Sequence, residues 1–205
     1  MKFYLLRHGE TEWNKLGKFQ GLTDVSLNER GLSQARDSAL AALNWEPSAL
    51  YASPLARTVQ VAEEIRKTTG VAVATDPGLR ELSLGDLEGV TGAEMREGWP
   101  EVYRAWRNNP ADVTMPNGES LVQLQERAWR VILEIEEAQA GDAGVVVVSH
   151  NFTIRTIICA ILDIPLYNFH RMSLGLGSLC AFESDGSGRR LITYNCNSHL
   201  SPQNR

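Results

Sequence analysis

The sequence has few cysteines and no long apolar run. Its 205 residues include only three cysteines, Cys159, Cys180 and Cys196, and none is spaced C-x-x-C from another. An odd cysteine count without that spacing argues against a disulfide framework and a structural zinc site. The longest purely aliphatic run, Val145 to Val148, is far short of the ~20 apolar residues that cross a bilayer. We therefore expect reduced thiols, no membrane-spanning segment and a cytoplasmic location.

An excess of basic residues is also missing. Lys and Arg number 20 against 25 Asp and Glu, which gives a formal net charge of −5. Nucleic-acid-binding domains carry a basic stripe, so nucleic acid is not an expected partner. A small anionic ligand stays compatible with this balance, because a few arginines focused in one cleft outweigh a mildly acidic surface.

Apolar stretches and helical periodicity alternate along the chain. Short apolar stretches predict strands at residues 2–6, 49–52, 71–75 and 144–149. Amphipathic segments predict helices at residues 28–44, 53–70, 119–140 and 151–162. Asn28 and Ser53 are the expected N-caps of the first two helices, and Pro54 the expected first residue of the second. The pattern indicates an α/β fold with a mostly parallel open sheet and helices on both faces.

Two segments depart from this alternation. Residues 179–183 and 190–194 flank Asp185-Gly186-Ser187-Gly188, which predicts a hairpin and hence one antiparallel edge. The polar, aromatic-containing segment 91–109 predicts short helices outside the sheet. We expect one domain over residues 1–205, with a small helical cap near 90–117.

Three polar clusters directly follow three of the predicted strands. They are Arg7-His8-Gly9, the segment 53–58 that contains Arg57, and Ser149-His150-Asn151. Ligands of open α/β sheets bind at the carboxyl ends of the strands, so two arginines and two histidines should meet at one rim. Two guanidinium groups bind a phosphate monoester through paired hydrogen bonds. Their charges would lower the pKa of a neighbouring histidine and keep it unprotonated as a nucleophile.

Arg7-His8-Gly9-Glu10-Thr11 resembles the signature of the histidine phosphatase superfamily, which includes the phosphoglycerate mutases. The supporting motifs follow in the family's order: Trp13-Asn14, Gln20-Gly21, the segment 53–58, Glu81 with Gly85 and Glu88-Gly89, and Ser149-His150. They cover nearly the whole chain, from Phe3 to His199, which argues against a chance match.

The resemblance implies a role for each of these residues. His8 is expected to be the nucleophile that becomes phosphohistidine. Glu81, rather than the neighbouring Asp86 or Glu88, is expected to protonate the leaving oxygen and later to activate water, and His150 completes the catalytic set. The expected phosphate-binding residues are Arg7, Asn14, Gln20, Gly21, Arg57 and Asn151. No metal or other cofactor is expected, because arginines and histidines supply the positive charge.

One departure from the family pattern lies at the entrance. Asn151-Phe152 stands where the family commonly has glycine after the second histidine. Asparagine tolerates left-handed backbone geometry, so the phosphate site should persist. Phe152 is expected to narrow the entrance, and Trp106 and His199 are the other expected contacts to the leaving group.

The pattern favours a phosphomonoesterase acting on a small phosphorylated metabolite. The alternative is a 2,3-bisphosphoglycerate-dependent phosphoglycerate mutase, but the compact segment 81–118 shows no clear second phosphate site. A non-enzymatic phospholigand-binding protein should have lost at least one residue of the expected catalytic core, which is intact here: Arg7, His8, Arg57, Glu81 and His150. A zinc site at the histidines is not expected, because the positive charge of Arg7 beside His8 would repel a divalent cation. A homodimer is the family-level expectation.

Overall fold

The computed structural model describes residues 1–139, 144–185 and 187–205. Within them, one sheet has the strand order β3-β2-β4-β1-β5-β6. The strands are β1 (Lys2–Arg7), β2 (Pro47–Ala52), β3 (Val73–Thr75), β4 (Gly144–Ser149), β5 (Leu179–Asp185) and β6 (Gly188–Cys196). The first four are mutually parallel, and β5 is antiparallel to both of its neighbours. The predicted α/β class, with a mostly parallel sheet and an antiparallel edge, is confirmed.

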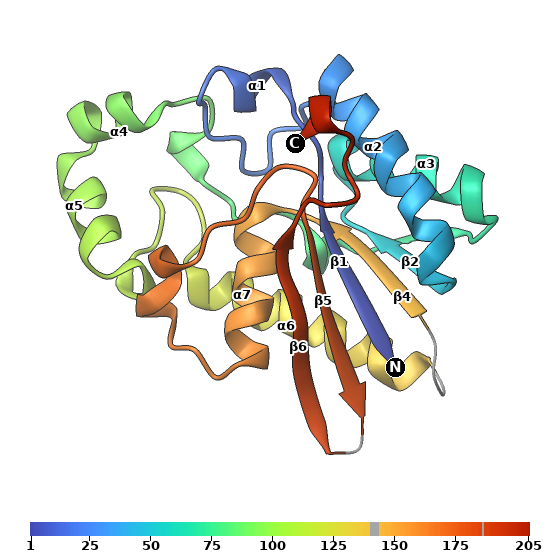
Figure 1. Cartoon of the computed structure of the whole chain (residues 1–205). Helices are drawn as coiled ribbons and strands as arrows, with labels where there is room; N and C mark the ends of the chain where they lie inside the picture. The colour runs from blue at the N-terminus through green and yellow to red at the C-terminus, as the bar shows by residue number, and fades with distance from the viewer. Residues whose placement is uncertain (140–143, 186) are drawn as a thin grey trace.

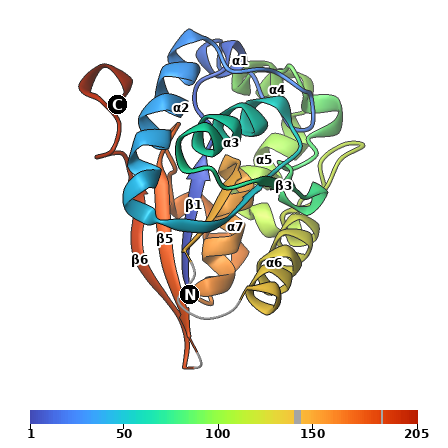
Figure 2. The same cartoon turned by 90° about the vertical axis from the view of Figure 1, so that its right-hand side faces the viewer.

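Helices cover both faces of the sheet. Figures 1 and 2 show α2 (Glu29–Ala42) and α3 (Ala56–Thr69) on one face, and α6 (Leu121–Ala138) and α7 (Asn151–Ile161) on the other. Asn28 caps α2 as predicted, because its side chain accepts a hydrogen bond from the Gly31 N–H.

The two central strands are buried on both faces. Leu5 of β1 and Val147 of β4 pack toward α6 and α7, whereas Leu6 and Val148 pack toward α2 and α3. A strand that is covered on both faces needs apolar side chains at successive positions, which explains the run of four valines in β4. These strands fix the positions of the residues at their carboxyl ends.

Two further helices lie beside the sheet, α4 (Gly92–Gly98) and α5 (Pro100–Asn108) (Figure 1). A capping box between Thr91 and Glu94 starts α4, and Pro100 opens α5. Trp106 of α5 packs against a third apolar cluster, separate from the two cores of the sheet. The boundaries of a cap at 90–117 stay a prediction.

Some predicted boundaries differ from the structure. The expected helix start at Ser53 and Pro54 is wrong: α3 begins at Ala56, with Leu55 in the N-cap position. The third strand begins at Val73 rather than at residue 71. The expected end of a helix at residue 140 and the turn residue Gly186 lie outside the described residues. A short helix, α1 (Glu12–Lys15), was not predicted. Among the described helices, none has the length and apolar character to cross a membrane.

Candidate active site

The three polar clusters meet at the carboxyl edge of the sheet. Arg7 and Ser149 are paired in register at the ends of β1 and β4, and β2 ends beside them at Ala52. A cavity of about 160 Å³ opens here. Its lining residues are Arg7, His8, Asn14, Lys18, Phe19, Gln20, Gly21, Arg57, Glu81, Leu84, Asn151 and Phe152. The predicted residues that do not line it are His150, Trp106 and His199.

His8 is held in one tautomer. Its Nδ1 lies 2.7 Å from the carbonyl oxygen of Gly9, and a carbonyl only accepts, so Nδ1 carries the proton. The Nε2 atom is then left with a free lone pair. Burial, followed by the charges of Arg57 and Arg7, holds the pKa of His8 well below its usual range. The side chain is therefore neutral near pH 7, with an unprotonated Nε2.

His150 lies beside His8, with ring centroids 5.3 Å apart. Its Nε2 is 2.8 Å from Oγ of Ser53. Its Nδ1 is buried and has no hydrogen-bond partner among the described residues. Burial, followed by Arg57 and His8, also lowers the pKa of His150 well below its usual range.

Two arginines, Arg57 buried and Arg7 partly buried, supply the positive charge. Arg57 is fully buried, and its two terminal nitrogens donate to the carbonyls of Thr23 (3.0 Å) and Gly21 (2.8 Å). Arg7 donates to the carbonyl of Leu174. Burial lowers the pKa of Arg7 to about 10, so the group stays charged at neutral pH. The fixed carbonyls hold both guanidinium groups in place before any ligand binds.

Glu88 anchors the loop that holds Arg57. Its carboxylate accepts hydrogen bonds from the backbone N–H groups of Leu22 (2.8 Å) and Thr23 (2.9 Å). Gly21 has φ +55°, and a Cβ there would lie 2.2 Å from the Glu88 carboxylate. Only glycine fits this approach. Glu88 does not line the cavity, and its carboxylate instead holds the backbone of the loop at Leu22 and Thr23.

Two side-chain amides point their NH₂ groups away from the protein scaffold. The Oδ1 of Asn14 accepts from the backbone N–H of Thr11 (3.1 Å), and the Oε1 of Gln20 accepts from the Thr11 hydroxyl (3.0 Å). In the described part of the chain, neither NH₂ group donates to another residue. Both residues line the cavity, so these groups are free to donate to a ligand.

The carboxylate of Glu81 lies at the N-terminus of α7. Its carboxylate accepts hydrogen bonds from the backbone N–H groups of Leu82 (3.0 Å), Phe152 (3.2 Å) and Thr153 (3.3 Å). The side chain is only 7% exposed, and it lines the cavity. The free N–H groups of a helix N-terminus hold the carboxyl in a defined position.

The three expected leaving-group contacts have different surroundings. Phe152 lines the cavity, and Trp106 packs edge-on against it at 5.8 Å between centroids without reaching the cavity itself. His199 lies elsewhere, with Nε2 3.3 Å from Oγ of Ser38 and its ring against Trp45. The C-terminal segment thus packs against α2 instead of the entrance.

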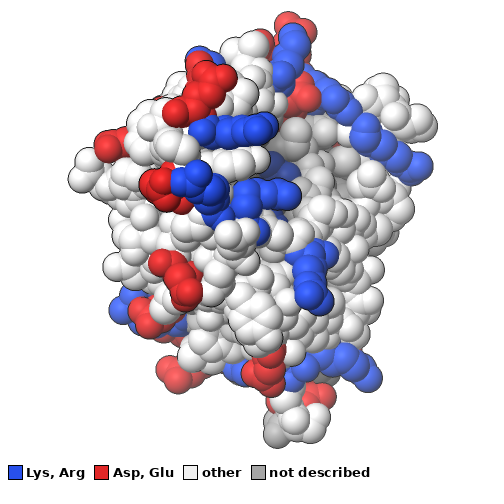
Figure 3. Space-filling view, turned by 90° about the vertical axis from the view of Figure 1, so that its left-hand side faces the viewer, with Lys and Arg blue, Asp and Glu red and all other residues white. Residues whose placement is uncertain are grey.

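Sequence reasoning missed three lining residues: Lys18, Phe19 and Leu84. Figure 3 shows Lys and Arg side chains gathered around a hollow on the face that carries α4 and α5. No group of three or more His, Cys, Asp or Glu side chains within residues 1–139, 144–185 and 187–205 is arranged to hold a metal ion.

The fold and the residues at its rim are those of an α/β protein with a preformed anion site. The chain belongs to the histidine phosphatase superfamily (branch 1), whose family model matches residues 3–197. It is 32% identical over 200 residues to phosphoserine phosphatase 1 of Hydrogenobacter thermophilus, covering 98% of this chain and 94% of the relative. It is 34% identical to a probable phosphoglycerate mutase of an Enterobacter species over 85% of this chain and 80% of the relative.

A similar solved structure is that of a mycobacterial glucosyl-3-phosphoglycerate phosphatase. The two have a TM-score of 0.89 at 28% identity, over 96% of this chain and 99% of the other. The likeness therefore extends over the whole sheet and its helices.

Proposed function

We propose that this protein is a phosphomonoesterase that hydrolyses a small phosphorylated metabolite through a phosphohistidine at His8. The observation that carries the proposal is the hydrogen bond from His8 Nδ1 to the carbonyl of Gly9. It leaves Nε2 unprotonated in a cavity lined by Arg7 and Arg57. A neutral imidazole beside two fixed cations suits attack on an anionic phosphorus centre.

The phosphoryl oxygens are bound by two guanidinium groups, which have N–H groups besides those that donate to backbone carbonyls, and by neutral donors of the cavity. Arg7 and Arg57 supply two positive charges for a group that carries −1.5 to −2 at neutral pH. His150 Nδ1 has no hydrogen-bond partner among the described residues, and we propose that it carries the proton and donates to a phosphoryl oxygen, with Nε2 accepting from the Ser53 hydroxyl. The NH₂ groups of Asn14 and Gln20 add two donors. Asn151 and Gly21 also line the cavity.

The reaction proceeds in two transfers. In the first, the bond from phosphorus to the ester oxygen breaks, the bond to His8 Nε2 forms, and Glu81 gives its proton to the departing oxygen. In the second, water attacks the phosphohistidine, Glu81 takes the proton from the water, and inorganic phosphate and neutral His8 are released. The proton that Glu81 donates in the first transfer is replaced by the proton that it takes from water in the second.

Hydrolysis is favoured over mutase chemistry by the cations of the cavity. A bisphosphoglycerate-dependent mutase must bind a second phosphoryl group, but among the described residues Lys18 is the only Lys or Arg that lines the cavity besides Arg7 and Arg57. Relatives with phosphatase names match nearly the full length of the chain.

We further propose that α4 and α5 form a cap over the entrance and that the protein acts in the cytoplasm, with a homodimer as the expected assembly.

The test combines trapping with a substrate panel. Wild-type protein mixed with a phosphate-labelled substrate and quenched in base should retain label on a histidine, which acid then releases. His8→Ala should retain none and should not turn over. A panel of phosphorylated metabolites, run beside a mutase assay, identifies the reaction. Label on a serine or aspartate, or mutase activity without hydrolysis, would overturn the proposal.

A further inference from the structure

Lys18 is a cation at the active site that phosphoryl binding does not use. It lines the cavity together with Arg7 and Arg57, which already match the charge of one phosphoryl dianion. It makes no ion pair within 4.0 Å in the described part of the chain. Its Nζ lies over the ring of Trp13, 5.9 Å from the centroid. A third cation in the same cavity calls for a second negative charge in the ligand.

The backbone around Lys18 is fixed at the mouth of the site. Its N–H donates to the carbonyl of Trp13 (2.9 Å). The neighbouring Phe19 donates to the carbonyl of Val90 (2.9 Å), and its own carbonyl accepts from Gly89 (2.8 Å). These bonds tie the loop to the segment that follows Glu81, so the lysine stem starts from a defined position and only its side chain moves.

Glu94, an acidic side chain that senses the charge of Lys18, is already engaged. Glu94 accepts hydrogen bonds from both the N–H and the hydroxyl of Thr91, each at 2.8 Å. Those bonds, and to a smaller extent the charge of Lys18, lower the pKa of Glu94. Glu94 is therefore held at the start of α4 and leaves the ammonium group of Lys18 available to a ligand.

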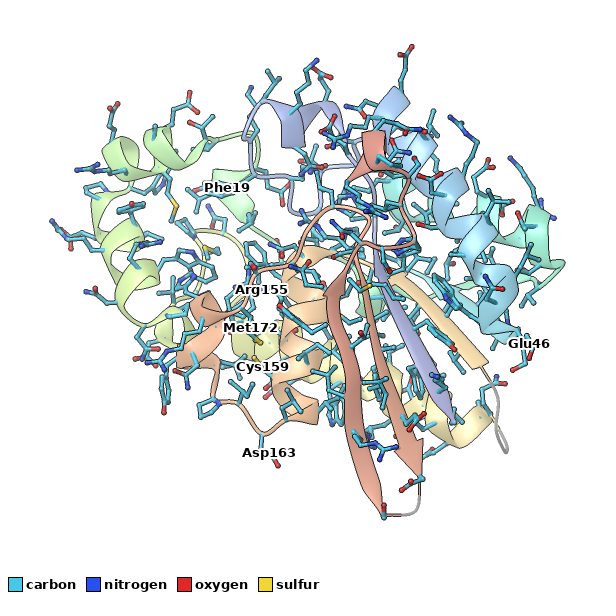
Figure 4. All side chains as sticks on the ribbon, in the orientation of Figure 1. Phe19, Glu46, Arg155, Cys159, Asp163 and Met172 are labelled. Atoms are coloured by element: carbon cyan, nitrogen blue, oxygen red, sulfur yellow. The ribbon has the colours of Figure 1, made fainter. Side chains whose placement is uncertain are left out.

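The rest of the entrance is apolar. Phe19, Leu84 and Phe152 line the cavity together with Lys18, and Figure 4 shows Phe19 between the sheet and the helices α4 and α5. Carbon atoms of a leaving group would pack there, with one polar end reaching the lysine. A single ammonium suits one carboxylate better than a second phosphoryl group, which is bound best by paired guanidinium forks.

We infer that Lys18 selects phosphomonoesters whose leaving alcohol carries a carboxylate. The inference rests on the proposed function, because it assigns the far end of the same substrate. The phosphoryl group lies between Arg7 and Arg57, the carbon chain lies against the apolar wall, and the carboxylate meets Lys18 at the mouth. Lys18 is a specificity residue and takes no part in bond making.

The experiment compares substrates that differ only at the carboxylate. O-Phosphoserine and 2-phosphoglycolate are each paired with their carboxamides, and nitrophenyl phosphate serves as the general substrate. The wild type should prefer the acids. Lys18→Gln should lower kcat/KM for the acids by about 10- to 100-fold, the range for a charged hydrogen bond, mainly through KM. The carboxamides and nitrophenyl phosphate should be unaffected, and Lys18→Arg should keep most of the preference.

Lys15 provides the matched control. Its side chain is 65% exposed, pairs with Glu12 at 3.9 Å and does not line the cavity, so Lys15→Gln should leave every rate unchanged. Equal loss on acids and carboxamides in Lys18→Gln, or no preference for the acids in the wild type, would overturn the inference while hydrolysis of nitrophenyl phosphate still supports the phosphatase. No hydrolysis of any of the five compounds would overturn both proposals.

Discussion

Both carboxylate oxygens of Glu81 lie 3.2 Å from the backbone nitrogen of Phe152, in the first turn of α7. The main chain of the helix therefore holds the proposed acid, whereas the ring of the same phenylalanine lines the entrance. Backbone donors and the Thr153 hydroxyl (3.2 Å) position the carboxyl of Glu81, and Glu81→Gln tests its proposed role in proton transfer.

Glu81→Gln should slow hydrolysis of an alkyl phosphate by about 10²- to 10⁴-fold, the usual range for general acid catalysis. A nitrophenyl ester needs little protonation of its leaving group, so its phosphorylation step should slow much less. The burst in single-turnover kinetics reports this step, because steady-state rates also contain the hydrolysis of the phosphohistidine.

Asp86→Asn is the control for this substitution. Asp86 lies in the same segment, on the surface, and both of its oxygens accept from the amide of Asn117 at 3.1 Å. Its replacement should leave the burst unchanged for both kinds of ester. A loss that depends on the leaving group in Asp86→Asn, but not in Glu81→Gln, would show that the wrong acid has been named.

Glu88→Ala should weaken phosphate binding although Glu88 does not line the cavity. The substitution leaves the N–H groups of Leu22 and Thr23 without their acceptor and loosens the carbonyls that hold Arg57. Loss of buried hydrogen-bond partners costs about 1–3 kcal/mol of stability. Urea unfolding and the Kd of inorganic phosphate measure the two effects. An exposed carboxylate on α4, Glu97, provides the control through Glu97→Ala, and unchanged phosphate affinity in Glu88→Ala would contradict the anchoring role.

Stability should fall as the pH drops below 6.5. Folding keeps the pKa values of His8 and His150 well below the ordinary value of 6.5. Between 6.5 and the lowered native values the unfolded chain binds more protons, so the free energy of unfolding decreases with falling pH, by up to about 1.4 kcal/mol per pH unit for each histidine. Urea unfolding at about pH 7.5 and about pH 5.5 measures this slope. His8→Asn should have a smaller slope than the wild type, and an equal slope would count against a neutral buried His8.

Hydrolysis should continue in excess EDTA. Arg7 and Arg57 stay charged over the accessible pH range, and they supply the stabilisation that a metal ion provides in other phosphoryl-transfer sites. The check is the rate of phosphate release before and after exhaustive chelation. Complete loss of activity that added metal restores would be the contrary result.

The strand ends were the most predictable part of the site. The run Val145 to Val148 can only be a strand covered on both faces, and the residues after it then have to lie at the sheet edge. The same logic brings Arg7 and Arg57 to that edge. For this reason, polar clusters that are distant in sequence were expected at one rim of the sheet, and Arg7, Arg57 and Asn151, one from each cluster, line one cavity there.

The errors arose where a distant partner decides the local structure. Ser53-Pro54 before an amphipathic run has the composition of a helix start, but Ser53 Oγ binds His150, 97 residues away, and α3 begins later. Phe19 reaches the cavity through backbone pairing with Gly89 and Val90, which no local pattern reveals. The anchoring role of Glu88 depends on the same loop arrangement.

The placement of Glu81 by main-chain donors has a consequence for how the substrate range of such a protein changes. Any residue except proline at position 152 keeps the N–H that holds the carboxyl, while its side chain remodels the wall of the entrance. Under the proposed mechanism, single substitutions there exchange one leaving group for another and leave the carboxyl of Glu81 in place. The substrate range can therefore change through successive single substitutions, each of which keeps the enzyme active.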